Sequence, residues 1–367
     1  MNTGLYIHLP FCKQKCKYCD FASFAGQENL VEPYLDALSK EAARSPVKNF
    51  QTLYVGGGTP SLLSADQLAA LCQVIVQNFG PIAAFSESTL EANPESLTPQ
   101  KIAVLREFGF NRLSLGLQSF NDAELKTIGR VHNAATFLKA YQTARQGGFT
   151  NINVDLIAGL PGQTLDSFLH SLAQVVSLSP EHLSVYGLQV EENTPLFESG
   201  FVCDQLLMRR MLEQTHWRLE QAGYHHYEIS NFAKSGREAR HNTLYWHNGP
   251  YVGLGSSAAS YTGGVRRQNT PSVSDYIRCM AEGKSPVVFS ERLAGKAREG
   301  ESVLLGLRLL DGLTLSSRQE QFFGKEIEKH IQNGLLERAG KKVKLTFEGL
   351  FLANEVFCSF VAPFEEA

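Results

Sequence analysis

The sequence lacks the features of three protein classes: membrane-spanning, secreted and nucleic-acid-binding. Its longest apolar runs fall far short of the ~20 residues that cross a bilayer. Acidic and basic residues nearly cancel, 37 against 34, so no positive excess favours nucleic acid or an anionic membrane as the main partner. Only five residues precede Tyr6, so a signal peptide would have to contain the cysteine-rich segment that follows. We therefore expect a cytoplasmic protein without nucleic acid as a partner.

The cysteines do not form the even set that a disulfide framework needs. There are seven, and in a cytosolic chain clustered thiols indicate metal or redox chemistry instead. Three of them lie within FCKQKCKYCDF, residues 11–21, while four are scattered singly. Of the scattered ones, Cys72 and Cys358 lie in apolar helical contexts, so we expect them to be small core residues.

Short β-rich runs alternate with amphipathic helical stretches over the first 190 residues. The expected strands are 5–9, 52–55, 86–92, 112–117, 152–157 and 182–188. Several of the helices between them begin at a plausible N-cap: Ser64, Thr98, Asn133 and Thr164. Six strand–helix units predict a parallel sheet with right-handed crossovers. Since a closed barrel needs eight, we predict an α/β fold with an open, partial (β/α)6 TIM-like barrel, although the pattern alone also allows a doubly wound sheet.

The alternation stops after residue 190. Residues 204–222 predict one long helix, residues 227–232 a strand, and the Gly-, Ser- and Tyr-rich residues 248–264 a loop. We divide the chain into a barrel over residues 1–200, a connecting segment over 201–289 and a smaller α+β domain over 290–367.

The expected C-terminal domain resembles a winged-helix unit, with a helix, a hairpin and a second helix from residue 326 onward. Winged helices often bind DNA, but the basic residues here are confined to the hairpin tip, at Lys341, Lys342 and Lys344. With the charge of the whole chain nearly balanced, a solvated wing is the favoured interpretation.

The three clustered cysteines, Cys12, Cys16 and Cys19, directly follow the first expected strand, where parallel β/α folds keep their active sites. The spacing C-x3-C-x2-C lets one loop surround a single metal centre. Three thiolates on a cubane iron–sulfur cluster leave one iron open to a substrate or cofactor. The alternatives are a structural zinc site completed by His8, and three unliganded thiols. Phe21, where a fourth cysteine could stand, is expected to be an apolar cover of this loop.

This spacing after a first strand resembles the defining motif of radical S-adenosylmethionine (SAM) proteins. The resemblance implies a [4Fe-4S] cluster on the three cysteines, with SAM chelating the fourth iron through its amino and carboxylate groups. Reduction of the cluster then cleaves SAM to methionine and a 5′-deoxyadenosyl radical. YIHLPFCKQKCKYCDF, residues 6–21, is similar to one branch, the oxygen-independent coproporphyrinogen III oxidase-like proteins, and the similarity extends over essentially the whole chain.

Two further segments match positions near SAM in this family. The GGGTP turn, which contains Gly57, Gly58 and Thr59, follows the second expected strand and resembles the segment that contacts the methionine part of SAM. Glycine there lets the backbone approach a ligand closely, although many β/α loops need a glycine. Tyr6 matches a tyrosine near SAM, and its alternative role is that of a packed strand aromatic.

Four polar residues complete the expected SAM site. Glu91, Gln118 and Asp155 lie at or near strand ends on one rim, and the resemblance implies that they hold the ribose and adenosine side. Arg130, in the adjoining loop, is implied to pair with the SAM carboxylate, a task that suits its permanently charged, two-pronged guanidinium. Each one alone could instead be a strand-end cap or a surface ion pair.

The branch contains two kinds of protein. The decarboxylating oxidases usually carry another cysteine where Phe21 stands here, together with an N-terminal extension that is absent here. The heme chaperones of the HemW type have the C-D-F form and an H-N-x-x-Y-W motif associated with heme. This motif stands here as HNTLYW, residues 241–246.

The motif has the chemistry of a heme site. Imidazole is a common axial ligand of heme iron, and aromatic side chains flank a flat macrocycle well. The resemblance therefore implies heme-binding roles for His241, Tyr245 and Trp246, with His247 as the rival iron ligand. Local hydrogen bonds and packing are the alternative for these side chains.

We therefore predict a radical SAM-fold protein that binds a [4Fe-4S] cluster, SAM and heme, and delivers heme to acceptor proteins such as respiratory enzymes. The family implies peripheral contact with the cytoplasmic membrane, and a homodimer is a further expectation. Whether SAM is cleaved is left open, and coproporphyrinogen oxidase activity is not expected. The alternatives are a SAM-dependent coproporphyrinogen III decarboxylase and a zinc-stabilised binding module.

Overall fold

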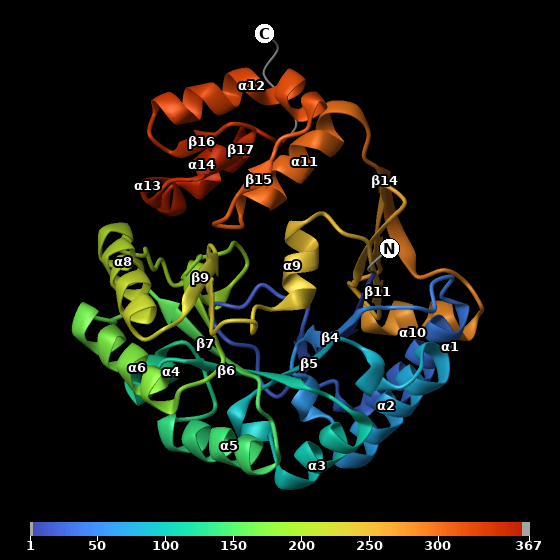
Figure 1. The fold of residues 1–367 in the computed structure, drawn as a ribbon. Coiled ribbons are helices and arrows are strands. Elements are labelled where there is room, and N and C mark those ends of the chain that lie inside the picture. The colour runs from blue at the N-terminus through green and yellow to red at the C-terminus, as the bar shows by residue number, and fades with distance from the viewer. Residues whose placement is uncertain (1–2, 362–367) are drawn as a thin grey trace.

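The computed structural model describes residues 3–361, and six parallel strands form the centre of the fold. They lie side by side in chain order, each hydrogen-bonded in parallel to the next. These strands are β1 (Gly4–Leu9), β4 (Thr52–Gly57), β5 (Glu87–Ala92), β6 (Arg112–Gln118), β7 (Ile152–Ala158) and β8 (His182–Gly187). They curve into an open barrel, which confirms the predicted partial barrel (Figure 1).

Helices cover the convex side of this barrel (Figure 1). They are α1 (Val31–Arg44), α2 (Ala65–Phe79), α3 (Pro99–Phe108), the short α4 (Asp122–Thr127), α5 (Ala134–Gln146) and α6 (Leu165–Leu178). The four predicted N-caps are confirmed, because each side chain accepts a hydrogen bond from the backbone N–H three residues later: Ser64, Thr98, Asn133 and Thr164. Single 3₁₀ turns occupy Glu28–Leu30, Pro60–Leu62, Ile82–Ala84 and Pro94–Ser96.

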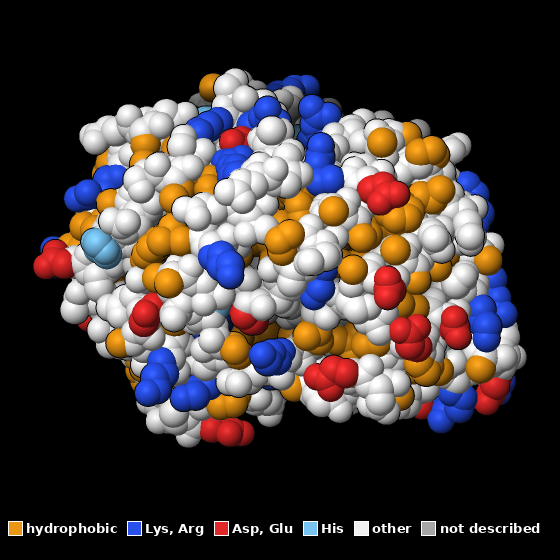
Figure 2. All heavy atoms as spheres, turned by 90° about the horizontal axis from the view of Figure 1, so that it is seen from below, with side chains coloured by type: hydrophobic (Ala, Val, Ile, Leu, Met, Phe, Trp, Pro, Cys, Tyr) orange, Lys and Arg blue, Asp and Glu red, His pale blue; other side chains and the backbone are white. Residues whose placement is uncertain are grey.

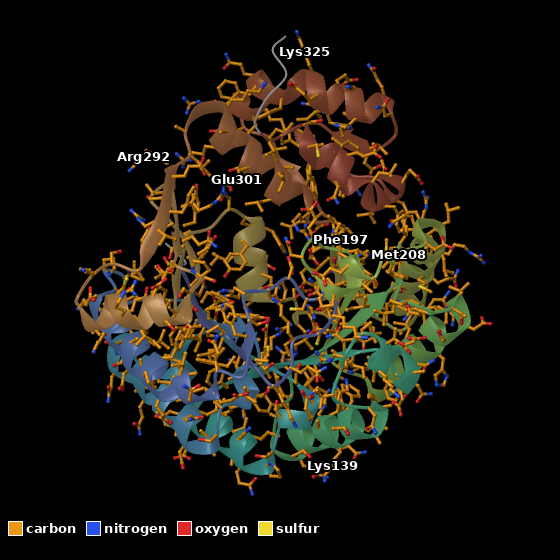
Figure 3. All side chains as sticks on the ribbon, turned by 180° about the vertical axis from the view of Figure 1, so that it is seen from behind. Lys139, Phe197, Met208, Arg292, Glu301 and Lys325 are labelled. Atoms are coloured by element: carbon orange, nitrogen blue, oxygen red, sulfur yellow. The ribbon has the colours of Figure 1, made fainter. Side chains whose placement is uncertain are left out.

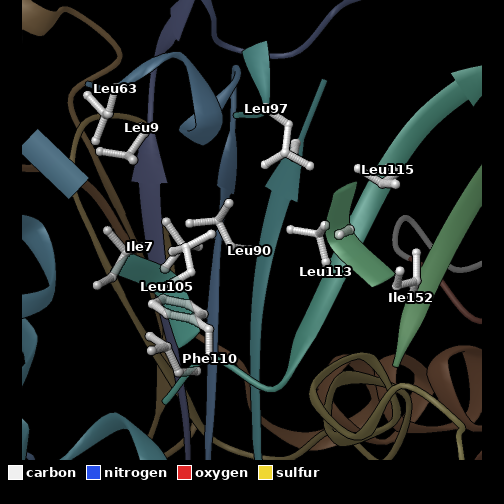
Figure 4. Close-up of a cluster of buried hydrophobic side chains, with 14 of the residues drawn as sticks. Ile7, Leu9, Leu63, Leu90, Leu97, Leu105, Phe110, Leu113, Leu115 and Ile152 are labelled. Atoms are coloured by element: carbon white, nitrogen blue, oxygen red, sulfur yellow. The ribbon is translucent and has the colours of Figure 1, made fainter. Parts of the chain in front are cut away.

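The two faces of the sheet carry different side chains because successive residues of a strand point to opposite sides. In β6, Leu113 and Leu115 join the apolar core beneath the helices, beside residues such as Leu90 (Figure 4). Arg112 and Ser114, from the same strand, instead line a cleft inside the barrel. The barrel therefore has an apolar outer layer and a polar interior.

The sheet continues beyond both edges of the predicted barrel, to twelve strands among the described residues. β11 (Tyr251–Leu254) pairs in parallel with β1, and antiparallel strands β12 (Ala259–Thr262), β13 (Val265–Asn269) and β14 (Val287–Arg292) extend it. The prediction of a loop over 248–264 is therefore wrong. Gly253 lies within β11, and a Cβ there would lie 2.1 Å from the Ala259 carbonyl oxygen, so the close approach of β12 accounts for this glycine.

At the other edge, a hairpin replaces the single strand expected over 227–232. It consists of β9 (His225–Glu228) and β10 (Asn231–Ala233), and β10 pairs with β8. The predicted long helix is confirmed as α8 (Gln205–Gln221), with Asp204 as its N-cap. The short α7 (Pro195–Glu198) precedes it. Two more helices follow, α9 (Arg240–Trp246) and α10 (Val273–Ala281), and α9 lies at the open side of the barrel (Figure 1).

The C-terminal α+β region lies across the open side of the barrel (Figure 1). It comprises α11 (Gly295–Leu307), β15 (Leu313–Thr314), α12 (Ser317–Gln332), the hairpin β16 (Leu336–Ala339) and β17 (Lys342–Leu345), α13 (Phe347–Phe351) and α14 (Ala353–Cys358). Val303, Phe323 and Ile327 belong to a core cluster of its own. The boundary expected at residue 290 falls inside β14, which still pairs with the barrel sheet.

Of the two cysteines expected in the core, only one is there. Cys72 is fully buried, which confirms that prediction, whereas Cys358 is exposed because it ends α14 on the surface.

On the face opposite the C-terminal region, Lys and Arg side chains are interspersed with Asp and Glu (Figure 2). Over residues 3–361, no helix combines the length and apolar composition needed to cross a bilayer.

Candidate functional site

The cysteine loop leaves β1 and is tied to its neighbours at several points. Its start, β2 (Phe11–Cys12), pairs with β3 (Phe24–Ala25), which closes the loop at its base. The Lys17 amide donates to the Ile128 carbonyl at 3.0 Å, and the Leu196 amide donates to the Lys17 carbonyl at 2.9 Å. The loop that carries the thiols is thus anchored to segments following β6 and β8.

The three thiols of this loop are free and half-buried: Cys12, Cys16 and Cys19. Burial raises the pKa of the Cys19 thiol, so metal binding there must displace a proton. Within residues 3–361, no three His, Cys, Asp or Glu side chains already converge with metal-binding geometry. Three soft sulfur donors on one anchored loop nevertheless match the donor set of a [4Fe-4S] cluster with one open iron.

The structure does not support two expectations about this loop: His8 as a zinc ligand and Phe21 as a cover. His8, the proposed fourth zinc ligand, uses both ring nitrogens: Nδ1 lies 2.9 Å from the Tyr6 hydroxyl and Nε2 lies 2.8 Å from the Ala22 carbonyl oxygen. The arrangement therefore does not support a Cys3His zinc site. Phe21 is 63% exposed at the edge of the cleft, so the prediction that it covers the loop is wrong.

The glycine turn after β4 packs directly against the cysteine loop. A Cβ on Gly58 would lie 2.6 Å from the Phe11 carbonyl oxygen and 3.0 Å from the Cys12 sulfur. The Thr59 hydroxyl lies 3.4 Å from the same sulfur. Gly57 has a φ of +114°, which glycine adopts without strain. The close approach, and not a loose loop, explains the glycines here.

The expected polar SAM residues lie along one wall of the cleft. Glu91 accepts hydrogen bonds from the Tyr54 hydroxyl at 2.7 Å and the Gly57 amide at 3.1 Å, and burial raises its pKa to about 7. Asp155 accepts one from Asn153 at 2.7 Å, and burial raises its pKa too. Gln118 ends β6 with a φ of +73° and lines the same cleft.

Arg130 lies in the loop after α4, beside the cysteine loop. One terminal nitrogen donates to the Gly116 carbonyl oxygen at 2.7 Å and to Asn93 Oδ1 at 2.8 Å. The other lies 3.6 Å from the Cys16 sulfur. Sequence spacing placed Arg130 near the rim, and the structure places it against the cysteine loop. Tyr6 bonds to His8, and neither Tyr6 nor Arg130 is among the residues that line the cleft.

The HNTLYW segment lies in α9, near the residues where β4 begins, whereas the cysteine loop follows the end of β1. His241 is fully buried, with Nδ1 2.8 Å from Thr52 Oγ1 and Nε2 2.7 Å from the Tyr245 hydroxyl. Burial lowers its pKa to about 3, so the ring is neutral. Thr52 begins β4, whereas the cysteines follow the end of β1, so His241 lies far along the strands from the thiols. The structure does not bring the two expected sites together.

The other residues of α9 and His247, which follows it, differ in what they contact and in exposure. The ring of Trp246 stacks against Arg308, whose guanidinium carbon lies 4.3 Å from the ring centroid. His247 is exposed, and Asn242 is the one residue of α9 that lines the main cleft, within the described chain. The rival iron ligand is therefore accessible, while His241 is not.

The main cleft joins the cysteine loop to the C-terminal region and has a volume of about 1480 Å³. Cys19 and Tyr18 line one end, the polar barrel interior forms the middle, and α8 faces α13 at the other end. Phe197 and Met208 contribute apolar surface there from α7 and α8 (Figure 3). Sequence reasoning missed Arg112 and Ser114 in the interior, although the alternation of polar residues and leucine in β6 was a signal for them.

Two family models match the chain: the Radical SAM superfamily over residues 6–175 and the HemN C-terminal domain over residues 296–352. Heme chaperone HemW of Bacillus subtilis (strain 168) is 39% identical over 97% of this chain and 98% of its own length. Heme chaperone HemW of Lactococcus lactis subsp. lactis (strain IL1403) is 34% identical over 98% and 97%, respectively. The chain belongs to the HemW family.

The radical SAM superfamily, of which this HemW-family chain is a member, implies a [4Fe-4S] cluster and SAM, in agreement with the thiol loop and the polar wall. The fold of this chain is similar to that of coproporphyrinogen III oxidase (HemN) from Escherichia coli, with a TM-score of 0.86 and 26% sequence identity. That match covers 98% of this chain and 90% of the HemN chain. The shared architecture therefore includes the C-terminal region.

Proposed function

We propose that this protein is a heme chaperone that binds a [4Fe-4S] cluster, SAM and heme, and passes heme to acceptor proteins such as respiratory enzymes. The observation that carries the proposal is the near full-length similarity to proteins named heme chaperone. The cleft supports it, because about 1480 Å³ exceeds the roughly 300–1,000 Å³ of typical small-molecule pockets and leaves room for a ligand besides SAM.

The cysteine end of the cleft is the part that we assign to the cluster and SAM. Cys12, Cys16 and Cys19 hold the cluster, which supplies the electron for SAM cleavage when it is bound and reduced. Glu91 provides a carboxyl group on the cleft wall, and Arg130 provides a fixed cation beside the cysteine loop, 3.6 Å from the Cys16 sulfur. Their hydrogen bonds to the backbone orient both side chains before any ligand arrives.

The expected heme residues do not line this cleft, to which α9 contributes Asn242 among the described residues. His241, Tyr245 and Trp246 are the expected heme residues, but in this structure an iron atom could reach His241 only after its bond to Thr52 or Tyr245 opens. His247 is exposed and needs no such change. Acceptor proteins in the cytoplasmic membrane would bring this protein to the membrane surface as a peripheral protein. The proposal also includes a homodimer.

Heme transfer is tested directly. The protein is reconstituted anaerobically with iron and sulfide, loaded with one equivalent of heme and mixed with an apo-hemoprotein whose holo spectrum differs from that of the donor. We expect heme to move to the acceptor faster than it does from a heme–albumin control. Transfer no faster than from albumin argues against a chaperone.

A second candidate, a coproporphyrinogen III oxidase, is favoured by the similarity to HemN and by a cleft that could hold a porphyrinogen. Phe21 at the position of a further cysteine speaks against it. Anaerobic incubation with SAM, a reductant and coproporphyrinogen III, followed by mass spectrometry, decides between the two. Protoporphyrinogen would identify an oxidase, while 5′-deoxyadenosine without decarboxylated product shows a working SAM site and no oxidase activity.

A further inference from the structure

A buried cation inside the cleft has no bonded partner in the described part of the chain. Arg112 begins β6, is 2% exposed and lines the cleft. Its guanidinium makes no hydrogen bond or ion pair with any residue in 3–361, and its Nε is fully shielded. Burying an uncompensated charge is costly, so such a side chain is expected to serve a partner that the fold itself does not supply.

The polar neighbours of Arg112 on β7 and β8 are bonded to one another. Asn153 donates to Ser114 at 2.8 Å and to Asp155 at 2.7 Å, and accepts from His182 Nδ1 at 2.6 Å. The Nε2 atom of His182 lies 2.8 Å from the Tyr227 hydroxyl, which closes this chain of hydrogen bonds. Arg112 stands outside the network although its charge acts on His182 and Asp155.

The nearby carboxyl groups make no hydrogen bond or ion pair with Arg112 in residues 3–361, although its charge lowers the pKa of Glu91 and Asp155 by less than burial raises it. Glu91 is held by Tyr54 and Gly57, and Glu87 accepts from the backbone amides of α9 at 2.9 and 3.0 Å. Burial is the largest influence on the pKa of Glu91 and raises it. Glu91 therefore carries less negative charge near neutral pH. Thr89, the partner of Arg112 in the β5–β6 register, likewise has a buried hydroxyl without a hydrogen bond.

Arg112 lies deeper in the barrel than the expected SAM residues. Register pairs Thr89 with Arg112 and Glu91 with Ser114, so Arg112 is two residues, about 7 Å, further from the cysteine end than the Glu91 level. A ligand group that reaches Arg112 would therefore lie deeper in the barrel than the SAM wall. The cleft offers apolar surface at the carboxyl ends of β7 and β8, where Met208 lies beside Gly159 and Gly187.

We propose that Arg112 is the anchor for a carboxylate of the tetrapyrrole, one propionate of the heme that the proposed function assigns to this protein. The inference rests on that function. A propionate is a carboxylate on a flexible two-carbon arm, so it can enter a polar interior while the apolar ring stays against the outer cleft. A guanidinium binds a carboxylate through two parallel hydrogen bonds, which fixes orientation as well as charge.

The test compares heme with its dimethyl ester, in which both propionates have lost their charge. Wild-type protein, Arg112→Gln and Arg237→Gln are each titrated with both compounds, the last as a control because Arg237 is exposed on the surface. We expect the wild type and Arg237→Gln to prefer the free acid by at least about 10-fold, the order of one charged hydrogen bond. In Arg112→Gln this preference should fall to within about twofold.

Two further measurements separate the proposal from a purely structural role. Arg112→Lys keeps the charge without the two-pronged geometry and should restore part of the preference for the free acid. Thermal unfolding of apo Arg112→Gln should be no lower than that of the wild type, because the variant removes an unpaired buried charge. A large loss of stability would instead mark Arg112 as a structural counter-charge and overturn the proposal.

The remaining outcomes are equally decisive. A wild type that binds heme and its ester equally well refutes the anchor and leaves the chaperone function intact. A wild type that binds neither compound contradicts the proposed function itself. An Arg112→Gln variant that loses SAM binding but still prefers the free acid assigns Arg112 to the SAM site.

Discussion

The Arg130 guanidinium lies 3.6 Å from the Cys16 sulfur while it donates to the Gly116 carbonyl oxygen at 2.7 Å. One side chain thus joins the thiol loop to the end of β6. Because Arg130 also donates to Asn93, its orientation is fixed from three directions. The Arg130 cation would therefore stabilise both a thiolate on this loop and an anionic ligand bound beside it.

Arg130→Lys is expected to weaken SAM binding by about 10-fold or more, since lysine keeps the charge but cannot bond to Gly116, Asn93 and a ligand carboxylate together. Equilibrium dialysis with the reconstituted protein measures the effect. The matched control is Arg145→Lys, because Arg145 pairs with Glu181 outside the cleft. Equal SAM affinity in wild type and Arg130→Lys would remove Arg130 from the proposed SAM site.

Cys19→Ala should abolish the cluster, because two remaining thiolates do not hold the cubane. Iron and acid-labile sulfide after anaerobic reconstitution are the readout, with Cys279→Ala as a control outside the loop. We expect Cys279→Ala to keep the iron content of the wild type. If Cys19→Ala also kept it, the cluster would have to be bound elsewhere.

Glu91→Gln should change how stability depends on pH. Burial raises the pKa of Glu91 from its usual 4.5 to about 7, so the folded state holds this proton more tightly than the unfolded state. The favourable contribution is complete below pH ~4.5 and is lost as pH rises through about 7. From pH 5 to 8, wild-type stability should therefore fall relative to Glu91→Gln, by on the order of 2 kcal/mol.

Urea unfolding of the apo proteins at both ends of this range measures the change. Glutamine has one acceptor oxygen and can keep only one of the two bonds, which Tyr54 and Gly57 donate to different oxygens of Glu91. That loss does not depend on pH, so the change in the difference between pH 5 and 8 reports the ionisation of Glu91. A difference between the two proteins that does not vary with pH would show that Glu91 ionises normally in the fold.

His241→Ala should weaken heme binding without changing cluster iron, if His241 is the ligand. It also removes two buried hydrogen bonds and should cost about 2–4 kcal/mol of stability. Thr52→Val is the matched control, since it breaks one of the same bonds and keeps the imidazole. An equal loss of heme affinity in both variants would mean that His241 acts through the fold, and a loss in His247→Ala instead would identify the exposed rival.

The sequence predicted the parts of the fold that depend on local pattern. The strand expected over residues 112–117 and the N-caps such as Ser64 and Thr98 are decided by neighbours in the chain, and they were confirmed. β11 was missed because its partner is β1, and the pairing of Gly4 with Tyr251 leaves no local signature in a Gly-rich segment. Long-range pairing of this kind is not visible in periodicity.

The site divides in the same way. The thiol loop and the glycine turn meet because both follow neighbouring parallel strands, which spacing can predict. The place of His241 depends on how α9 enters the open side of the barrel, so the motif alone could not show that its ring bonds to Thr52. Arg112 was missed because a single arginine at the start of a strand resembles any surface cation until its burial is known.

The position of β1 between β4 and β11 has a consequence for biosynthesis. β1 leaves the ribosome first, yet one of its edges has no partner until residues 251–254 have been made. At roughly 5–20 residues per second, this delay lasts about 12–50 s, during which an unpaired strand edge can join another chain. Fragments that end before β11 should therefore aggregate, even though they contain all three clustered cysteines.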